Sequence, residues 1–360
     1  MTNVLSAKSG PLTDQSSSAT FSGLAKGLEI DFEARQKAVV HERLIVGLLL
    51  GNGGLGDQSF NDMTYAGLIR IRQQYNLKLI IEDSDKNDAA FEAAMQRLID
   101  DGAHIIVAND FYLKDLVAKY APENPDRYFI LQDAILTGLP NVVCLSYSVE
   151  EGSFLVGVLS GLLTTTNRVG FIGGVDIPVM HVFRKGFRDG VLFSNPAVDI
   201  MEVFVSKAPD YSGFRSPAAG YDIAMSAYED GVDIIYAAAG LTGNGVIQAA
   251  RKSGTFAIGV DSDQDHLAKG SVLTSMMKRL DIATFNEVVR IIEGKFIPGV
   301  KKYGLKDCGV GLTPMKYSRQ FIPDAVISEL SHIEARIIDG SINVANFMDT
   351  VESGAKGSSQ

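Results

Sequence analysis

Short apolar segments alternate with helical patterns along most of this chain, and this alternation restricts the fold more than any other feature. Residues 44–50 (LIVGLLL) have the pattern of a buried parallel strand, a glycine-rich turn follows, and Phe60-Asn61-Asp62 opens a helix. The same strand, turn and helix pattern recurs to about residue 148 and then starts again. It predicts an α/β fold of two Rossmann-like halves in tandem, each with a parallel sheet. A hairpin-like stretch is expected at residues 299–313.

Charge and composition narrow the range of partners. The formal net charge of the 360 residues is −10, and neither Lys nor Arg forms a run. We therefore expect no nucleic acid partner and no anionic membrane partner. No apolar run reaches the ~18 residues that a membrane span needs. The His and Cys residues follow no metal-binding pattern, so no metal site is expected.

The turn after the first strand matches a dinucleotide-binding fingerprint. Gly51, Gly53 and Gly56 have the spacing G-x-G-x-x-G. A bound pyrophosphate would need positive potential at the start of the following helix. Asp57 comes directly after the third glycine, and Asn61 is the expected N-cap, so a negative charge stands where the phosphate would lie. We therefore expect no cofactor, and a loop without any ligand is the alternative.

Acidic residues follow the predicted strands and are candidate ligand contacts. In a doubly wound fold the carboxyl ends of the strands gather along one rim, where ligands bind. Carboxylates at this rim can accept charge-assisted hydrogen bonds from the hydroxyl groups of a sugar. Asx-turns and helix caps are the alternative explanation for each of them. The candidates are Asp57, Asp110, Asp133 and Asp261.

Aromatic residues and one lysine complete the candidate site. Phe60, Tyr65 and Tyr236 lie at or beside the same strand ends, where a flat base could stack, although Tyr65 could equally be a core residue. Gly240 opens a second glycine-rich turn. Lys278 closes a strand and could donate to a ligand hydroxyl or pair with an acidic residue. No Ser-His-Asp set or other catalytic constellation is apparent, and this favours binding over turnover.

Several motifs, in order, resemble the basic membrane protein (BMP) family, the purine nucleoside receptor type of ABC solute-binding lipoprotein. GLGDQSFNDMTYAG is similar to the opening motif of that family. GGVDIPVMHVFRKGFRDG and DIIYAAAGLTGNGVIQAA resemble its later motifs, and AIGVDSDQ and SMMKR complete the order. The similarity spans about residues 43–314.

The resemblance implies a type I periplasmic-binding-protein fold, with two lobes joined by a three-segment hinge and closing on a ligand. Lobe 1 would comprise residues 43–148 and about 281–306, and lobe 2 residues 149–280 and about 307–350. Residues 1–42 are expected to form a disordered extension, and residues 351–360 a flexible tail.

The resemblance also implies a function. Family members bind purine nucleosides for an ABC importer, so adenosine, guanosine or inosine would be the ligand and an ABC permease the partner. Carried onto this chain, Asp261 and Lys278 would hold the ribose, and Tyr65 and Tyr236 would flank the base. The remaining polar contacts would come from Asp57, Asn61 and Asp133.

The resemblance implies a periplasmic or cell-surface location. Family members usually begin with a lipoprotein signal and an acylated Cys, and neither occurs before residue 43. A cytoplasmic location, with the chain acting as a ligand-sensing regulator of the same fold, is therefore the alternative. A less expected alternative is an enzyme, either a dehydrogenase using the turn from Gly51 to Gly56 or a nucleoside hydrolase using the clustered Asp residues.

Overall fold

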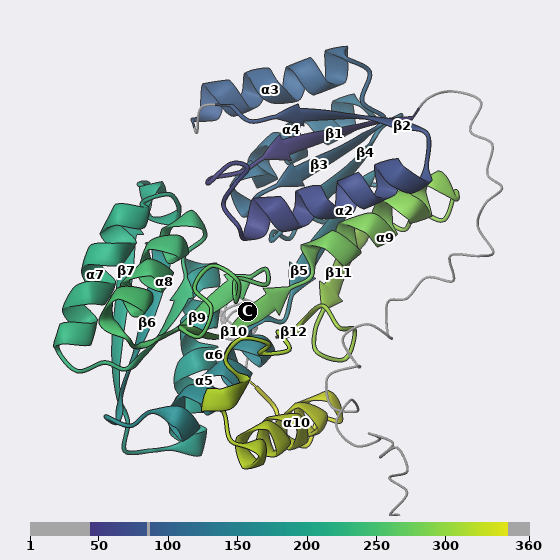
Figure 1. Cartoon of the computed structure of the whole chain (residues 1–360). Coiled ribbons are helices and arrows are strands. Elements are labelled where there is room, and N and C mark those ends of the chain that lie inside the picture. Colours follow the sequence, from purple (N-terminus) through teal and green to yellow (C-terminus); the bar gives the residue numbers. More distant parts are fainter. Residues whose placement is uncertain (1–43, 85–86, 345–360) are drawn as a thin grey trace, which may run out of the picture.

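The structure, a computed structural model, describes residues 44–84 and 87–344. Within this part the chain forms two lobes, each built on its own sheet (Figure 1). The expectations for residues 1–42 and 351–360 concern positions outside the described residues.

The sheet of lobe 1 has the strand order β11-β5-β4-β3-β1-β2, and all its pairings are parallel. Its strands are β1 (Leu44–Leu50), β2 (Leu77–Glu82), β3 (Ile105–Asn109), β4 (Tyr128–Gln132), β5 (Val142–Tyr147) and β11 (Gly299–Tyr303). Helices α2 (Phe60–Gln74) and α9 (Leu280–Ile292) pack on one face, and α3 (Asp88–Asp100) and α4 (Lys114–Glu123) pack on the other. Every residue of β3 is buried, as expected for a strand covered on both faces.

The sheet of lobe 2 repeats this arrangement with the order β12-β10-β9-β8-β6-β7. Its strands are β6 (Arg168–Asp176), β7 (Asp199–Lys207), β8 (Ile234–Ala238), β9 (Phe256–Asp261), β10 (Val272–Lys278) and β12 (Val310–Leu312). Helices α5 (Val149–Leu163) and α6 (Pro178–Ser194) cover one face, and α7 (Pro217–Glu229) and α8 (Leu241–Ser253) cover the other. Helix α10 (Asp324–Ile338) packs near α5.

The described chain passes between the two sheets three times. It crosses from β5 to α5, returns from β10 to α9, and crosses again from β11 to β12. The predicted α/β architecture is therefore present, but the hairpin expected at residues 299–313 is wrong. Strand β11 pairs in parallel with β5, whereas β12 pairs antiparallel with β10 of the other sheet. The third crossing separates the two strands, because the segment between them runs from one lobe to the other.

Candidate functional site

A cavity of about 80 Å³ lies between the two lobes, where strands of both sheets end. Of the residues predicted from the sequence, those that line it are Asp57, Phe60, Asp110, Asp133, Gly240, Asp261 and Lys278. The lining residues that the sequence reasoning missed are Asn52, Phe111, Val179, Met180, Phe183, Phe214, Ala238 and Val260.

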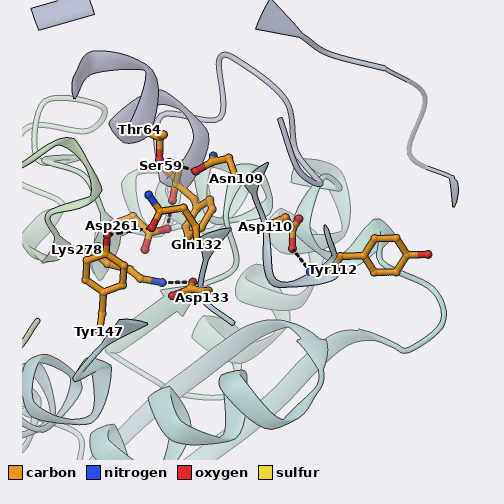
Figure 2. Close-up of polar contacts among 11 residues, drawn as sticks. Ser59, Thr64, Asn109, Asp110, Tyr112, Gln132, Asp133, Tyr147, Asp261 and Lys278 are labelled. Carbon is orange, nitrogen blue, oxygen red and sulfur yellow. Dashed lines mark hydrogen bonds and ion pairs between the residues drawn. The ribbon is translucent and has the colours of Figure 1, made fainter. Parts of the chain in front are cut away.

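A buried ion pair joins the two lobes at this cavity. Lys278, the last residue of β10, forms an ion pair through Nζ with Asp133, which follows β4 (Figure 2). The same Nζ lies 4.8 Å from the centroid of the Phe60 ring, 5.0 Å from that of Tyr147 and 5.8 Å from that of Phe183. Only 1% of Lys278 is exposed. The carboxylate and the rings offset the cost of removing this ammonium from water.

Asp261 contributes a carboxylate from lobe 2. It ends β9 in a left-handed conformation with φ 64°, and its Oδ2 accepts a 2.6 Å hydrogen bond from Ser59 Oγ of lobe 1 (Figure 2). Burial raises the pKa of Asp261 from 3.8 to about 6, although Lys278 and the Ser59 hydrogen bond oppose this rise. The group is therefore ionised at neutral pH. An ionised carboxylate has about four acceptor sites, so Asp261 can accept further donors from a ligand.

Asp57 lines the cavity, but its carboxylate mainly holds the start of α2. It accepts hydrogen bonds from the backbone N–H groups of Ser59 (2.9 Å), Asn61 (2.9 Å) and Asp62 (3.2 Å), and from Asn61 Nδ2 (2.9 Å). The expectation that Asn61 caps this helix is wrong, because Asn61 is its second residue and Asp57 accepts the free N–H groups. Burial raises the pKa of Asp57, although these hydrogen bonds oppose the rise.

Asp110 has a similar structural role at the end of β3. Its Oδ2 accepts hydrogen bonds from Asn52 N at 2.8 Å and Asn52 Nδ2 at 3.3 Å, and its Oδ1 accepts one from Tyr112 N at 3.0 Å. Gly51 allows this close approach, because a Cβ at that position would lie 2.2 Å from Oδ2. The first glycine of the supposed fingerprint thus makes room for a carboxylate. Burial raises the pKa of Asp110.

Three of the predicted site residues do not line the cavity. Asn61 is fully buried, and its Oδ1 accepts a 3.0 Å hydrogen bond from Asn109 Nδ2. Tyr65 packs against the apolar core beside α2, which was the alternative given for it. Asn61 is linked to the cavity through Asp57, whose Oδ2 accepts hydrogen bonds from Asn61 N and Nδ2.

Tyr236 is the third, and it lies in the core and does not line the cavity. It is fully buried, its ring centroid lies 5.4 Å from that of Phe187, and its hydroxyl oxygen lies 3.3 Å from Ser153 Oγ. The strand β8 continues to Ala238, and Ala238 lines the cavity instead. Because side chains alternate along a strand, Tyr236 and Ala238 lie on the same face of the sheet. Tyr236, however, lies two positions before the end of β8.

Apolar side chains from both lobes form the wall that the sequence reasoning missed. Met180 and Phe183 belong to the helical stripe of α6, and helical spacing alone is typical of core residues. Phe214 lies in the short 3-10 helix η3 (Ser212–Phe214), and no periodic pattern marks it. Phe111 could have been found, because it directly follows a predicted strand-end residue, Asp110.

The chemistry of the wall restricts the ligand. Among the described lining residues there are four carboxylates, one ammonium and eight apolar or aromatic side chains, three of which come from α6. Such a cavity suits a ligand with a flat apolar part and several hydroxyl groups, and it disfavours an anion. In residues 44–84 and 87–344, no group of three or more His, Cys, Asp or Glu is arranged to hold a metal ion. No described helix is both long and apolar enough to cross a membrane.

Comparison with known proteins adds independent findings. A family model, Bmp, described as ABC transporter substrate-binding protein PnrA-like, matches residues 45–346. Basic membrane protein A of Borreliella burgdorferi is 30% identical over 315 residues, which cover 84% of this chain and 88% of that protein.

Two solved structures have a similar fold. A solute-binding protein of an ABC transporter system from Aeropyrum pernix K1 superposes with a TM-score of 0.77 at 24% identity, covering 86% of this chain and 96% of that one. A transcriptional activator of the comK gene from Bacillus halodurans superposes with a TM-score of 0.70 at 22% identity, covering 83% and 99%. At these identities the likeness concerns the fold alone, and it confirms the predicted type I periplasmic-binding-protein fold.

Proposed function

The chain belongs to the Bmp family of ABC transporter substrate-binding proteins, and from this premise we propose that it captures a purine nucleoside between its lobes for delivery to an ABC permease. The observation that carries the proposal is the position of Asp261 and the Lys278–Asp133 pair in one cavity with the rings of Phe60 and Phe183. Groups that can bind hydroxyls and rings that can stack on a flat base therefore line the same cavity.

The ribose has chemically suitable partners in this arrangement. Asp261 is ionised at neutral pH and is only partly used by Ser59, so it accepts hydrogen bonds from the ribose hydroxyls. Lys278 has three donors, and Asp133 does not use them all, so the ammonium can donate to a ribose oxygen. Adenosine, guanosine and inosine share this ribose, and the base would therefore decide among them.

The base would lie against the apolar wall. Phe60 and Phe111 come from lobe 1, and Met180, Phe183 and Phe214 come from lobe 2. Contact with side chains of both lobes favours closure, because only the closed form brings the side chains of lobe 1 and lobe 2 to the same ligand. Stacking on an aromatic ring contributes about 1–3 kcal/mol per base in nucleic-acid complexes.

Transport is the proposed use of this binding. A receptor that closes on its ligand outside the cytoplasmic membrane presents one shape with ligand and another without it, and a permease can discriminate between the two. The protein itself would carry out no reaction on the nucleoside.

A thermal-shift screen of refolded protein tests the proposal, since refolding removes ligand carried over from the host. The panel contains purine and pyrimidine nucleosides, free bases, sugars, NAD and inosine 5′-monophosphate. A ligand at 100 times its Kd that binds only the folded state adds about 2.7 kcal/mol of stability. We expect purine nucleosides to raise the melting temperature by several degrees and the monophosphate to have little effect.

Other outcomes contradict specific parts of the proposal. A shift with sugars or NAD alone would mean that the family is right and the ligand wrong. Release of free base from inosine, or reduction of NAD, would support an enzyme instead.

A further inference from the structure

Two pairs of consecutive residues, one pair from each lobe, are joined by hydrogen bonds beside the cavity. Ser59 Oγ of lobe 1 donates a 2.6 Å hydrogen bond to Asp261 Oδ2 of lobe 2. In the opposite direction, Ser262 Oγ of lobe 2 donates to the backbone carbonyl of Gln58 in lobe 1. We call these four residues the clasp. None of them lies in the three segments that connect the lobes, so the clasp is a contact that lobe opening would break.

The backbone on both sides is held in an uncommon conformation. Gln58 has φ 54° and Asp261 has φ 64°, and neither is a glycine. A left-handed conformation is costly for such residues and persists where the surroundings enforce it. At Gln58 the conformation accompanies a carbonyl that accepts from lobe 2, and at Asp261 it accompanies a carboxylate that accepts from lobe 1. In each lobe, the residue with the left-handed backbone therefore also supplies the oxygen atom that accepts a hydrogen bond from the other lobe.

Further hydrogen bonds from lobe 2 converge on the same turn. Gln264 Nε2 donates to the Gln58 carbonyl at 2.9 Å, so this oxygen accepts from two side chains of lobe 2. Asn244 Nδ2, in the first turn of α8, lies 3.4 Å from the carbonyl of Asp57. All these contacts involve only protein groups, and none depends on a ligand.

We propose that the clasp is a conformational latch that stabilises the closed form of the protein and makes it populated without ligand. The latch shares Asp261 with the binding site. A nucleoside that donates to Asp261 therefore binds a carboxylate that Ser59 already holds in position. The entropic cost of ordering this side chain is then met before the ligand binds. The proposal about closure stands on the protein contacts alone, whereas its effect on nucleoside binding rests on the proposed function.

The first test needs no ligand. Small-angle X-ray scattering of the refolded, ligand-free protein compares the wild type with the double variant Ser59→Ala/Ser262→Ala. The Ser59 hydroxyl makes no capping bond to α2, so its removal spares that helix. The matched control is Ser331→Ala, which removes a serine-to-carbonyl hydrogen bond to Ile327 within α10.

The proposal expects a larger radius of gyration for the double variant than for the wild type and the control. Equal values for the wild type and the double variant would overturn it, because the clasp would then not determine the ligand-free shape. Urea unfolding of all three proteins shows whether the double variant is folded. Should it be unfolded, the single variant Ser262→Ala, which alters a half-buried side chain, replaces it in the same comparison.

The second test measures inosine release by stopped-flow fluorescence. The single variants Ser59→Ala and Ser262→Ala should each release inosine roughly 2- to 10-fold faster, with little change in association rate, since a hydrogen bond of the closed state is lost. An unchanged release rate would contradict the shared role of Asp261. If wild-type protein binds neither inosine nor another purine nucleoside, the proposed function fails, and the scattering result still decides whether the clasp controls closure.

Discussion

Lys278 and Asp133 form a buried ion pair that joins the end of a strand in one lobe to the end of a strand in the other. The side chain of Lys278 is 2% exposed and that of Asp133 is 13% exposed. Removing one partner from such a pair leaves an uncompensated charge, whereas removing both often costs little. The pair therefore allows stability and ligand binding to be tested separately.

Lys278→Met should lower both stability and affinity. The unpaired Asp133 carboxylate should reduce the free energy of unfolding by about 3 kcal/mol. Purine nucleoside affinity should fall, because a donor is lost and because the pKa of Asp261, which Lys278 lowers, rises further. Adding Asp133→Asn should restore most of the stability and none of the affinity. Urea unfolding and calorimetric titration measure the two effects, and recovery of binding in the double variant would remove Lys278 from the site.

Asp261→Asn should weaken binding while leaving the protein stable. Asn tolerates the left-handed backbone at this position and can still accept from Ser59. Loss of charge-assisted hydrogen bonds should reduce nucleoside affinity by about 10- to 100-fold. Wild-type affinity in this variant would show that the carboxylate does not contact the ligand.

Asp57→Ala should give the opposite result. Its carboxylate holds the free N–H groups at the start of α2, so its loss should cost about 1–2 kcal/mol of stability. The direct effect on affinity should be smaller than that of Asp261→Asn. A variant of Asp57 with full stability would contradict the capping role.

Protonation of Asp265 should make the protein more stable in mild acid than at neutral pH. Burial raises the pKa of Asp265 to about 6, although a hydrogen bond from Thr313 opposes the rise. The folded protein therefore binds this proton more tightly than the unfolded chain, whose carboxyl titrates near 3.8. The resulting stabilisation is complete below pH ~4 and is lost as the pH rises through 6.

The variant Asp265→Asn lacks this titration and isolates its effect. Urea unfolding at pH 4 and pH 7 should show that lowering the pH stabilises the variant less than the wild type, by on the order of 2 kcal/mol. Asp265 lies outside the cavity lining, so nucleoside affinity serves as the control and should not change. Identical pH dependence in both proteins would mean that the carboxyl titrates normally.

The fold followed from the sequence because it depends on local patterns. Strand β1 (Leu44–Leu50), for example, is a mostly buried apolar run, and its bounds were predicted as they are found. The partners of β11 and β12 were not predictable in this way. The sheet that each of these strands joins depends on contacts with residues distant in the sequence. The sequence of a short strand does not indicate which strand it will pair with.

The site followed from the sequence only in part. Strand-end position places Asp133 and Asp261 at the rim, because all parallel strands of a lobe end on the same side. Whether a carboxylate faces a ligand or holds the backbone depends on hydrogen bonds across the turn, and for Asp57 and Asp110 these bonds were not visible in the sequence. Buried aromatic residues were harder still, since β8 is buried along its whole length and nothing marked Tyr236 as interior.

Two aromatic substitutions test this distinction between core and cavity. Tyr236→Phe removes a hydroxyl 3.3 Å from Ser153 Oγ, so it should cost about 1 kcal/mol of stability and leave nucleoside affinity within about 2-fold of the wild type. Phe183→Leu, on a residue that lines the cavity beside Lys278, should lower affinity by about 10-fold or more, because a stacking surface is lost. Calorimetric titration with a purine nucleoside measures both. Tyr236 does not line the cavity. An affinity loss in Tyr236→Phe as large as that in Phe183→Leu would therefore place Tyr236 at the ligand, and would mean that the ligand-bound form differs from the arrangement of the lobes in this structure.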